Sequence, residues 1–216
     1  MIEAELKARV RDPDGLHERL SRLAAGERSV YRDKYYDHPG RDLAAAGREL
    51  RLRVIETADG KRSLLTFKEA AVDAASGSRP EHETEVGDPA VVDVLLRVLG
   101  LEVVVAFEKH CTNYRLSAEG RAMLATVVTV PELDGTFIEL ESMAEPVDVD
   151  AALAEIRAVL LRLGIAGEDF TTELYTDAVL SSRRDQRLCK RGWLPGCRAA
   201  RVSVSHHARF GQVGAP

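Results

Sequence analysis

Charged residues recur at every second position in several short stretches of this 216-residue chain. Near its start, Glu3, Glu5 and Lys7 alternate with apolar residues. The other stretches are Arg51-Leu52-Arg53, Arg79-Pro80-Glu81-His82-Glu83-Thr84-Glu85 and Glu139-Leu140-Glu141, and Lys68 and Lys109 lie in two further expected strands. Successive side chains of a β-strand point to opposite faces, so residues two apart share a face. Each stretch therefore predicts a strand with one charged face.

The two kinds of charge suit different ligands. Neighbouring carboxylates repel one another unless a divalent cation lies between them, and hard oxygen ligands favour Mg²⁺ or Mn²⁺. Clustered Arg and Lys side chains suit phosphate oxygens. If the charged faces line one cavity, its acids are Glu3, Glu5, Glu81, Glu83, Glu85, Glu139 and Glu141, and its bases are Lys7, Arg9, Arg51, Arg53, Lys68, Arg79 and Lys109. Such a cavity would bind a metal-bound polyphosphate.

A solvent-exposed sheet face would explain the same pattern of charges. An antiparallel sheet often has one face in water, where Lys–Glu pairs are incidental. Two features favour an enclosed cavity instead. The charges form short, pure clusters, and three expected helices can cover only part of a large sheet, which fits a sheet closed into a barrel with charges inward. Unpaired buried charge costs several kcal/mol, so these charges would have to compensate one another or hold a charged ligand. Spacing alone leaves both interpretations open.

The hydrophobic pattern predicts the elements that would position these residues. Alternation with period two predicts strands over 2–11, 50–54, 65–68, 79–85, 103–116, 123–130 and 136–142. Helical periodicity predicts helices near 13–24, 88–100 and 148–164, the second with Asp88 as its N-cap and Pro89 in its first turn. The sum is about eight strands and three helices. We therefore expect an α+β fold, an eight-stranded antiparallel β-barrel or tunnel with a few flanking helices.

Composition excludes several classes of protein. The chain is 45% hydrophobic and 30% charged with a formal net charge of −5, which is typical of a globular domain. No apolar run approaches the ~20 residues of a membrane span, and no apolar signal segment is visible at the start, so we expect a cytoplasmic protein without a membrane partner.

The basic residues concentrate at the C-terminal end. Residues 182–216 hold eight Lys or Arg against a single Asp. This tail could be a basic arm that meets nucleic acid or another anionic surface. Its Gly, Pro and Arg content offers little to bury, which favours a disordered extension without a function. We therefore expect one domain over 1–181, a disordered basic tail over 182–216, and no specific nucleic-acid partner.

The charged stretches, taken in order, are similar to a known family. The series is Glu3-x-Glu5-x-Lys7, Asp33-Lys34-Tyr35-Tyr36-Asp37, Leu50-Arg51-Leu52-Arg53, Thr66-Phe67-Lys68, Arg79-x-Glu81-x-Glu83, Phe107-Glu108-Lys109, residues 135–141 and Tyr175. It resembles the CYTH superfamily, also called triphosphate tunnel metalloenzymes, over about residues 1–180. A lone Glu-x-Glu-x-Lys is a weak signal, whereas the ordered series is a strong one.

The resemblance implies an eight-stranded tunnel that binds a triphosphate with Mg²⁺ or Mn²⁺. Members of the family include class IV adenylyl cyclases, thiamine triphosphatases and inorganic triphosphatases, and this chain looks most like the bacterial cyclase branch. By position, the metal would be held by Glu3, Glu5, Glu139 and Glu141, and the phosphates by Lys7, Arg51, Arg53, Lys68, Arg79 and Lys109. Of these, Glu3, Glu5 and Lys7 would be catalytic. Glu81 and Glu83 would be a second carboxylate group or would neutralise the bases. Dimers occur in the family, which makes a homodimer possible by analogy.

Two positions depart from the family pattern. Cys111 stands where the family usually has an Arg, and Val128 stands where it commonly has an Asp. Losing one base and one acid keeps the charge balanced but would weaken catalysis or shift the substrate. Three hypotheses follow: first a cyclase that converts ATP to cyclic AMP and pyrophosphate, second an inorganic or thiamine triphosphatase, and third a catalytically weak protein that binds nucleotide or polyphosphate.

Overall fold

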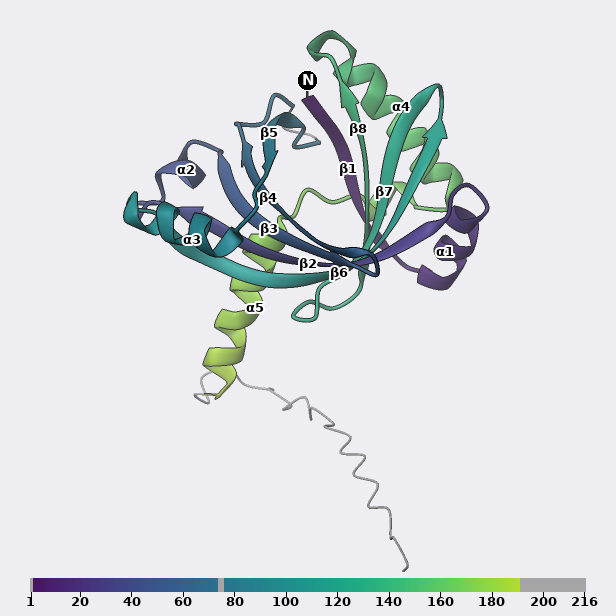
Figure 1. The fold of residues 1–216 in the computed structure, drawn as a ribbon. Helices are drawn as coiled ribbons and strands as arrows, with labels where there is room; N and C mark the ends of the chain where they lie inside the picture. The colour runs from purple at the N-terminus through teal and green to yellow at the C-terminus, as the bar shows by residue number, and fades with distance from the viewer. Residues whose placement is uncertain (1, 74–75, 191–216) are drawn as a thin grey trace, which may run out of the picture.

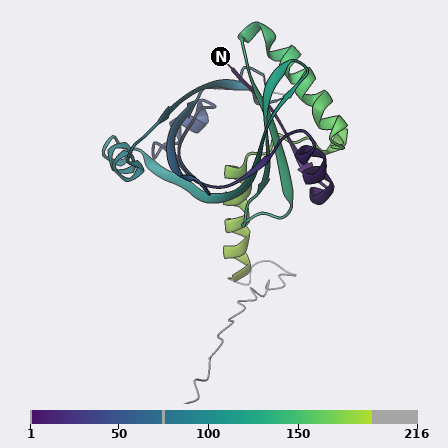
Figure 2. The same ribbon diagram turned by 45° about the vertical axis from the view of Figure 1, so that its right-hand side comes forward.

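The alternating stretches form the wall of a closed antiparallel barrel. The computed structural model describes residues 2–73 and 76–190. The strands are β1 (Ile2–Val10), β2 (Gly26–Asp37), β3 (Glu49–Thr57), β4 (Gly60–Lys68), β5 (Arg79–Glu85), β6 (Glu102–Ala118), β7 (Arg121–Thr129) and β8 (Thr136–Ala144). Around the barrel their order is β1-β5-β4-β3-β2-β6-β7-β8, and β8 pairs back with β1. The ring of strands is seen in Figure 2. The expected α+β barrel is confirmed.

Strand β1 shows why this sequence forms a barrel with charges inside. Its apolar residues are buried on the outer face of the wall: Ile2, Ala4, Leu6, Ala8 and Val10. Helix α4 (Val149–Arg162) packs on that face through Ile156 and Leu160, and it runs along β1 and β8 in Figure 1. Because alternate side chains point oppositely, this outer core forces the charged residues of β1 into the barrel.

The other helices lie outside or across the end of the wall. They are α1 (Pro13–Ser21), α2 (Asp42–Ala45), α3 (Pro89–Val98) and α5 (Tyr175–Lys190), with short 3₁₀ turns at Pro146–Asp148 and Gly167–Asp169. As predicted for α3, the Asp88 side chain accepts hydrogen bonds from the Ala90 and Val91 amides, and Pro89 stands at the first helical position. Within the described residues, no helix combines the length and the apolar character that crossing a membrane requires.

Helix α5 was not expected, and it runs through the predicted domain boundary at residue 181. Residues 182–190, the first part of the predicted tail, are helical. Tertiary contacts hold this helix: Val179 is fully buried, and the Arg183 guanidinium donates to both Glu132 carboxylate oxygens at 2.6 and 2.8 Å and to the Ala106 carbonyl at 2.7 Å. The rest of the predicted disordered tail, 191–216, lies outside the described residues.

One seam of the barrel is completed by a segment far along the chain. Strand β1 pairs with β5 at only two positions, Ile2↔Pro80 and Glu3↔Arg79. Further along β1, Ala8 forms a β-bridge with Phe170, and the Thr171 amide donates to the Lys7 carbonyl at 2.9 Å. Residues 170–176, called the strap below, therefore follow the free edge of β1 and lead into α5.

Candidate active site

The inner faces of the strands enclose a charged cavity of about 240 Å³. It is lined by all twelve residues to which the family resemblance assigned a site role: Glu3, Glu5, Lys7, Arg51, Arg53, Lys68, Arg79, Glu81, Glu83, Lys109, Glu139 and Glu141. Additional lining side chains include Tyr31, Tyr35, Glu49, Arg62 and Tyr175. The charged strand faces thus converge inside the barrel, which is the arrangement expected for an enclosed cavity and not for a solvated outer face.

Two charged residues on the same strand faces do not join the cavity. Arg9 lies near the end of β1, where its guanidinium pairs with Glu173 of the strap at 3.1 Å and both side chains are about half exposed. Glu85 is the last residue of β5 and is exposed. The expectation that these two line the cavity is therefore wrong, because both lie at strand ends beyond the enclosed part of the wall.

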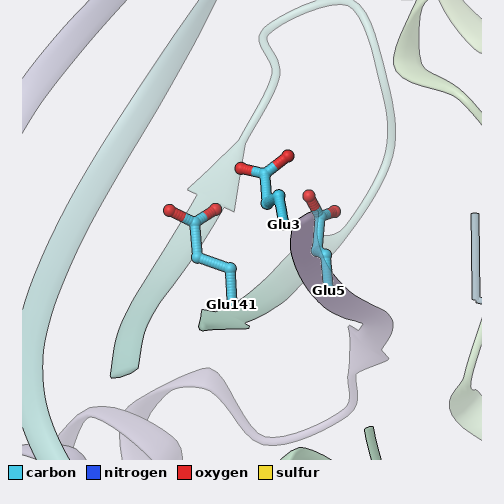
Figure 3. Close-up of side chains that lie close together, drawn as sticks. All are labelled: Glu3, Glu5 and Glu141. Atoms are coloured by element: carbon cyan, nitrogen blue, oxygen red, sulfur yellow. The ribbon is translucent and has the colours of Figure 1, made fainter. Parts of the chain in front are cut away.

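Three carboxylates gather at one side of the cavity. Glu3 and Glu5 come from β1, Glu141 comes from β8 opposite Glu5, and one oxygen of each lies within 4.8 Å of one oxygen of the others (Figure 3). Burial raises the pKa of Glu5 to about 7, and the charges of Glu139 and Glu3 add to the effect. Burial also raises the pKa of Glu141 well above its ordinary value, assisted by Glu3 and Glu5. The cluster therefore carries negative charge that the surrounding bases compensate only in part.

These three residues fit a hard divalent cation. The donors are all carboxylate oxygens, the ligand type that Mg²⁺ and Mn²⁺ prefer. A cation among them would also relieve the repulsion that raises two of the three pKa values. Glu139, the fourth predicted ligand, lies beside the cluster and outside its 4.8 Å grouping. Its carboxylate is 3.6 Å from the Lys109 ammonium, and although burial opposes ionisation, Lys109 and Lys7 lower the pKa of Glu139.

Lys68 links the carboxylate cluster to β5. Its ammonium is 2.5 Å from Glu3 and 2.8 Å from Glu81, and all three side chains are largely buried. Burial disfavours the charged form of Glu3, but Lys68 outweighs it and lowers the pKa of Glu3 to about 2. Glu83 accepts a hydrogen bond from Thr66 at 2.9 Å. Glu81 and Glu83 therefore lie where they can neutralise bases, which was one of the two roles considered for them.

Two arginines of β3 face the middle of the cavity. Arg53 donates from Nε and Nη2 to the two carboxylate oxygens of Asp33, each at 2.7 Å, and lies over the Tyr31 ring at 4.5 Å. Asp33 is fully buried, yet the Arg53 guanidinium holds its pKa well below the ordinary value against the effect of burial. Arg51 is also buried, and its Nε has no hydrogen-bond partner among the described residues. An unpaired buried donor of this kind suits an incoming anion.

Sequence reasoning did not assign a site role to Asp33 or to Tyr175. The available signal for both was their place in the series of residues that resembles the family. The pairing of Asp33 with Arg53 depends on the β2–β3 register, which the structure supplies. Tyr175 follows the wall of the barrel by more than thirty residues and returns to it only through the strap, so its spacing in the sequence did not place it in the cavity.

Lys7 and Arg79 are bases without a carboxylate partner inside the described residues. The Lys7 ammonium donates to the Glu173 carbonyl and lies 4.5 Å from the Tyr175 ring. Burial lowers the pKa of Lys7, and the neighbouring acids oppose that effect. Arg79 donates from Nε to the Gly77 carbonyl at 3.2 Å. Both side chains therefore retain donors for a negatively charged ligand.

The two departures from the family pattern lie in an apolar part of the barrel. Cys111 and Val128 face each other across β6 and β7, and both are buried in a cluster with Tyr31 and Phe137. Neither lines the charged cavity. Burial raises the pKa of the Cys111 thiol to about 12, so it stays protonated at neutral pH and is unsuited to nucleophilic chemistry.

Comparison with solved structures places this architecture among known ones. PH1819 from Pyrococcus horikoshii matches with a TM-score of 0.73 and 27% identity, over 84% of this chain and 99% of that chain. A Vibrio parahaemolyticus protein described as a candidate adenylate cyclase matches with a TM-score of 0.70 and 22% identity, over 84% of this chain and 98% of that one.

A third similar structure comes from Hippeastrum and is described as a candidate adenylyl cyclase with a dominant triphosphatase activity. It matches with a TM-score of 0.59 and 20% identity, over 84% of this chain and 96% of that chain. A comparison with curated proteins gave no match. The sequence itself matches the CYTH domain over residues 1–175, which spans all eight strands and the strap as far as Tyr175. The chain therefore belongs to the CYTH-domain family.

Proposed function

We propose that this protein is a metal-dependent enzyme that acts on a triphosphate inside its barrel, with conversion of ATP to cyclic AMP and pyrophosphate as the leading reaction. The observation that carries the proposal is the meeting of a three-carboxylate cluster with six bases on one enclosed wall. Family membership supports a triphosphate substrate. The Vibrio structure described as a candidate adenylate cyclase supports the cyclase reaction.

The bases divide into two groups by their contacts. Arg53, Lys68 and Lys109 lie against carboxylates of the wall, so their charges are partly compensated before any ligand enters. Lys7, Arg79 and the unpaired Nε of Arg51 remain available. Charge-assisted hydrogen bonds to phosphate oxygens are shorter and stronger than neutral ones. We assign the second group to direct contact with the phosphates and the first to neutralising the charge of the whole chain of phosphates.

A Mg²⁺ or Mn²⁺ ion held by Glu3, Glu5 and Glu141 would act as a Lewis acid on phosphate oxygens. The protein's own contribution is to hold these carboxylates ready on two paired strands. Burial raises the pKa of Glu5 to about 7 and that of Glu141 well above its ordinary value, so both carboxyls ionise less readily than free ones. Because metal ligation requires the ionised form, binding of a cation here would release protons.

The same cavity serves two reactions that differ in the nucleophile. In a cyclase the ribose 3′-hydroxyl attacks the α-phosphorus, and the P–O bond to pyrophosphate breaks. In a hydrolase water attacks the terminal phosphorus, the bond from that phosphorus to the bridging oxygen breaks, and the products are orthophosphate and the diphosphate that leaves. In both, the arginines and lysines of β1, β3, β4, β5 and β6 neutralise charge on the leaving phosphates, which is the main protein contribution to phosphoryl transfer.

Hydrolysis of a triphosphate is the second candidate reaction. The Hippeastrum structure, described with a dominant triphosphatase activity, favours it. Binding with little turnover is the third. The buried apolar residues Cys111 and Val128 favour it, because the family resemblance places an Arg and an Asp at these positions.

A product assay separates the three. Purified protein is incubated with Mg²⁺ or Mn²⁺ and either ATP or tripolyphosphate. Cyclic AMP with pyrophosphate indicates a cyclase, orthophosphate indicates a triphosphatase, and saturable binding without product indicates a binding protein. Glu141→Gln is the test variant, and Glu85→Gln, an exposed residue outside the cavity, is its matched control. Absence of both binding and turnover with either compound would refute the proposal.

A further inference from the structure

Tyr175 places a large polar side chain inside the charged cavity. It is the first residue of α5, its side chain is buried, and it lines the same cavity as the predicted site residues. Its position depends on the strap: the Thr171 amide is bonded to the Lys7 carbonyl, and Arg9 holds Glu173. The chain therefore returns to β1 immediately before Tyr175, and this return carries the ring into the barrel.

The ring of Tyr175 lies against two of the predicted phosphate-binding lysines. The Lys7 ammonium is 4.5 Å from the ring centre and the Lys109 ammonium is 4.2 Å from it. Phe137 packs edge-on against the same ring at 5.4 Å, which fixes the plane of Tyr175. A cation over an aromatic face is attracted to it, and more strongly when it is desolvated. The ring thus keeps both ammonium groups on one side of the cavity.

The hydroxyl of Tyr175 is a buried donor without a well-formed hydrogen bond. Burial raises the pKa of Tyr175 well above its ordinary value, and the nearby Glu139 carboxylate adds to this through its charge and a hydrogen-bonding contact. The hydroxyl nevertheless makes no hydrogen bond of normal geometry with any described residue. A buried polar group without a hydrogen bond destabilises the folded state, so each one in a native structure calls for an explanation.

We propose that Tyr175 is a ligand-contacting residue of the cavity, whose hydroxyl donates a hydrogen bond to a phosphate oxygen of the bound triphosphate while its ring positions Lys7 and Lys109. The inference rests on the proposed function, because it needs an anion in the cavity. Phosphate oxygens accept hydrogen bonds, and the two ammonium groups beside the ring draw them toward the hydroxyl. The strap and α5 thus become part of the binding site, in addition to the barrel wall.

Tyr175→Phe tests the hydroxyl alone, because it retains the ring and both cation–π contacts. Binding of tripolyphosphate in the presence of Mn²⁺ is measured by calorimetry. We expect Tyr175→Phe to weaken binding about tenfold, in the range of a hydrogen bond to a charged group. The thermal midpoint of the ligand-free protein should stay the same or rise, because the variant removes an unpaired buried group. Tyr175→Leu, which also removes the ring, should weaken binding further.

Tyr114→Phe is the matched control. Tyr114 is equally buried, but its hydroxyl is bonded to His17 at 2.8 Å outside the charged cavity. We expect this control to lower the thermal midpoint and to leave the affinity for tripolyphosphate unchanged. Wild-type affinity in Tyr175→Phe would overturn the assignment of Tyr175 while leaving the proposed function intact. Failure of the wild-type protein to bind tripolyphosphate would overturn both.

Discussion

The carboxylate cluster makes the ligand-free protein less stable than it would be without one of its members. Glu5 is surrounded by Glu3, Glu139 and Glu141, and burial together with these charges raises its pKa from 4.5 to about 7. We predict that Glu5→Gln stabilises the metal-free protein at pH 8 while it abolishes metal-dependent activity. An amide of nearly the same shape removes the charge without opening a cavity.

The magnitude of this stabilisation and the pH range over which it appears follow from the raised pKa of Glu5. A raised pKa of an acid means that the folded state binds the proton more tightly than the unfolded state. The stabilisation from that proton is complete below about pH 4.5 and is lost as the pH rises through about 7. At ~1.4 kcal/mol per pKa unit, the wild type loses up to about 3 kcal/mol that the variant does not lose. For a domain of this size that corresponds to roughly 6–12 °C in the thermal midpoint.

The assay is thermal and urea unfolding of metal-free wild type and Glu5→Gln between pH 5 and pH 8.5. The difference between the two proteins should be small at pH 5 and should grow to its full value by pH 8. Adding Mn²⁺ at pH 8 should stabilise the wild type and have little effect on the variant. Glu85→Gln, a change of the same type at an exposed site, should show neither effect.

A variant that is less stable than the wild type at pH 8 would refute this reasoning, because it would mean that Glu5 makes a net favourable contribution when ionised. A constant difference between pH 5 and pH 8 would refute the assigned pKa in the same way.

Four further results are expected. Glu141→Gln should remove metal-dependent turnover and leave the fold intact, as shown by an unchanged circular dichroism spectrum; unchanged turnover would exclude Glu141 from the site. Asp33→Ala should destabilise the protein by about 3–5 kcal/mol in urea unfolding, because it leaves the Arg53 guanidinium buried and unpaired. Removing residues 191–216 should leave turnover unchanged; a large loss of turnover would show that the tail has a role. Glu132→Ala should lower the thermal midpoint, because it removes both hydrogen bonds between the Glu132 carboxylate and Arg183 on α5.

The sequence predicts the barrel well because its signal is local. Strict alternation in β1 and β8 defines both the strand and the face that points inward, and α3 carries its own start signals in Asp88 and Pro89. Helix α2 is only four residues long, and helix α5 has a polar sequence whose few apolar residues find distant partners. Val179, for example, packs in a cluster with residues of β2, β6 and β8. Long-range contacts of that kind do not produce a helical hydrophobic pattern in the sequence of α5 itself.

Which residues line the cavity was predictable for a similar reason. Which of those residues pair with one another was not predictable. The position of each charged residue on its strand fixes that it points inward, so all twelve candidates reached the cavity. Which charges meet depends on the register between strands. The β1–β8 register sets Glu5 opposite Glu141 and Lys7 opposite Glu139, and the tilt of the wall brings Lys109 to Glu139. That register is why three acids gather and the fourth pairs with a base.

The pairing of β1 with β8 has a consequence for how the protein is made. Residues 2–10 pair along their whole length only with residues 136–144, so the first strand of the barrel cannot pair fully until the last strand has been synthesised. Such long-range pairing carries a large loop-closure cost and slows folding. Charged side chains at every second position of β1 disfavour aggregation before the strand has paired, because a strand edge rich in charge resists association with other chains. The charges proposed here for catalysis thus also protect the nascent chain from aggregation.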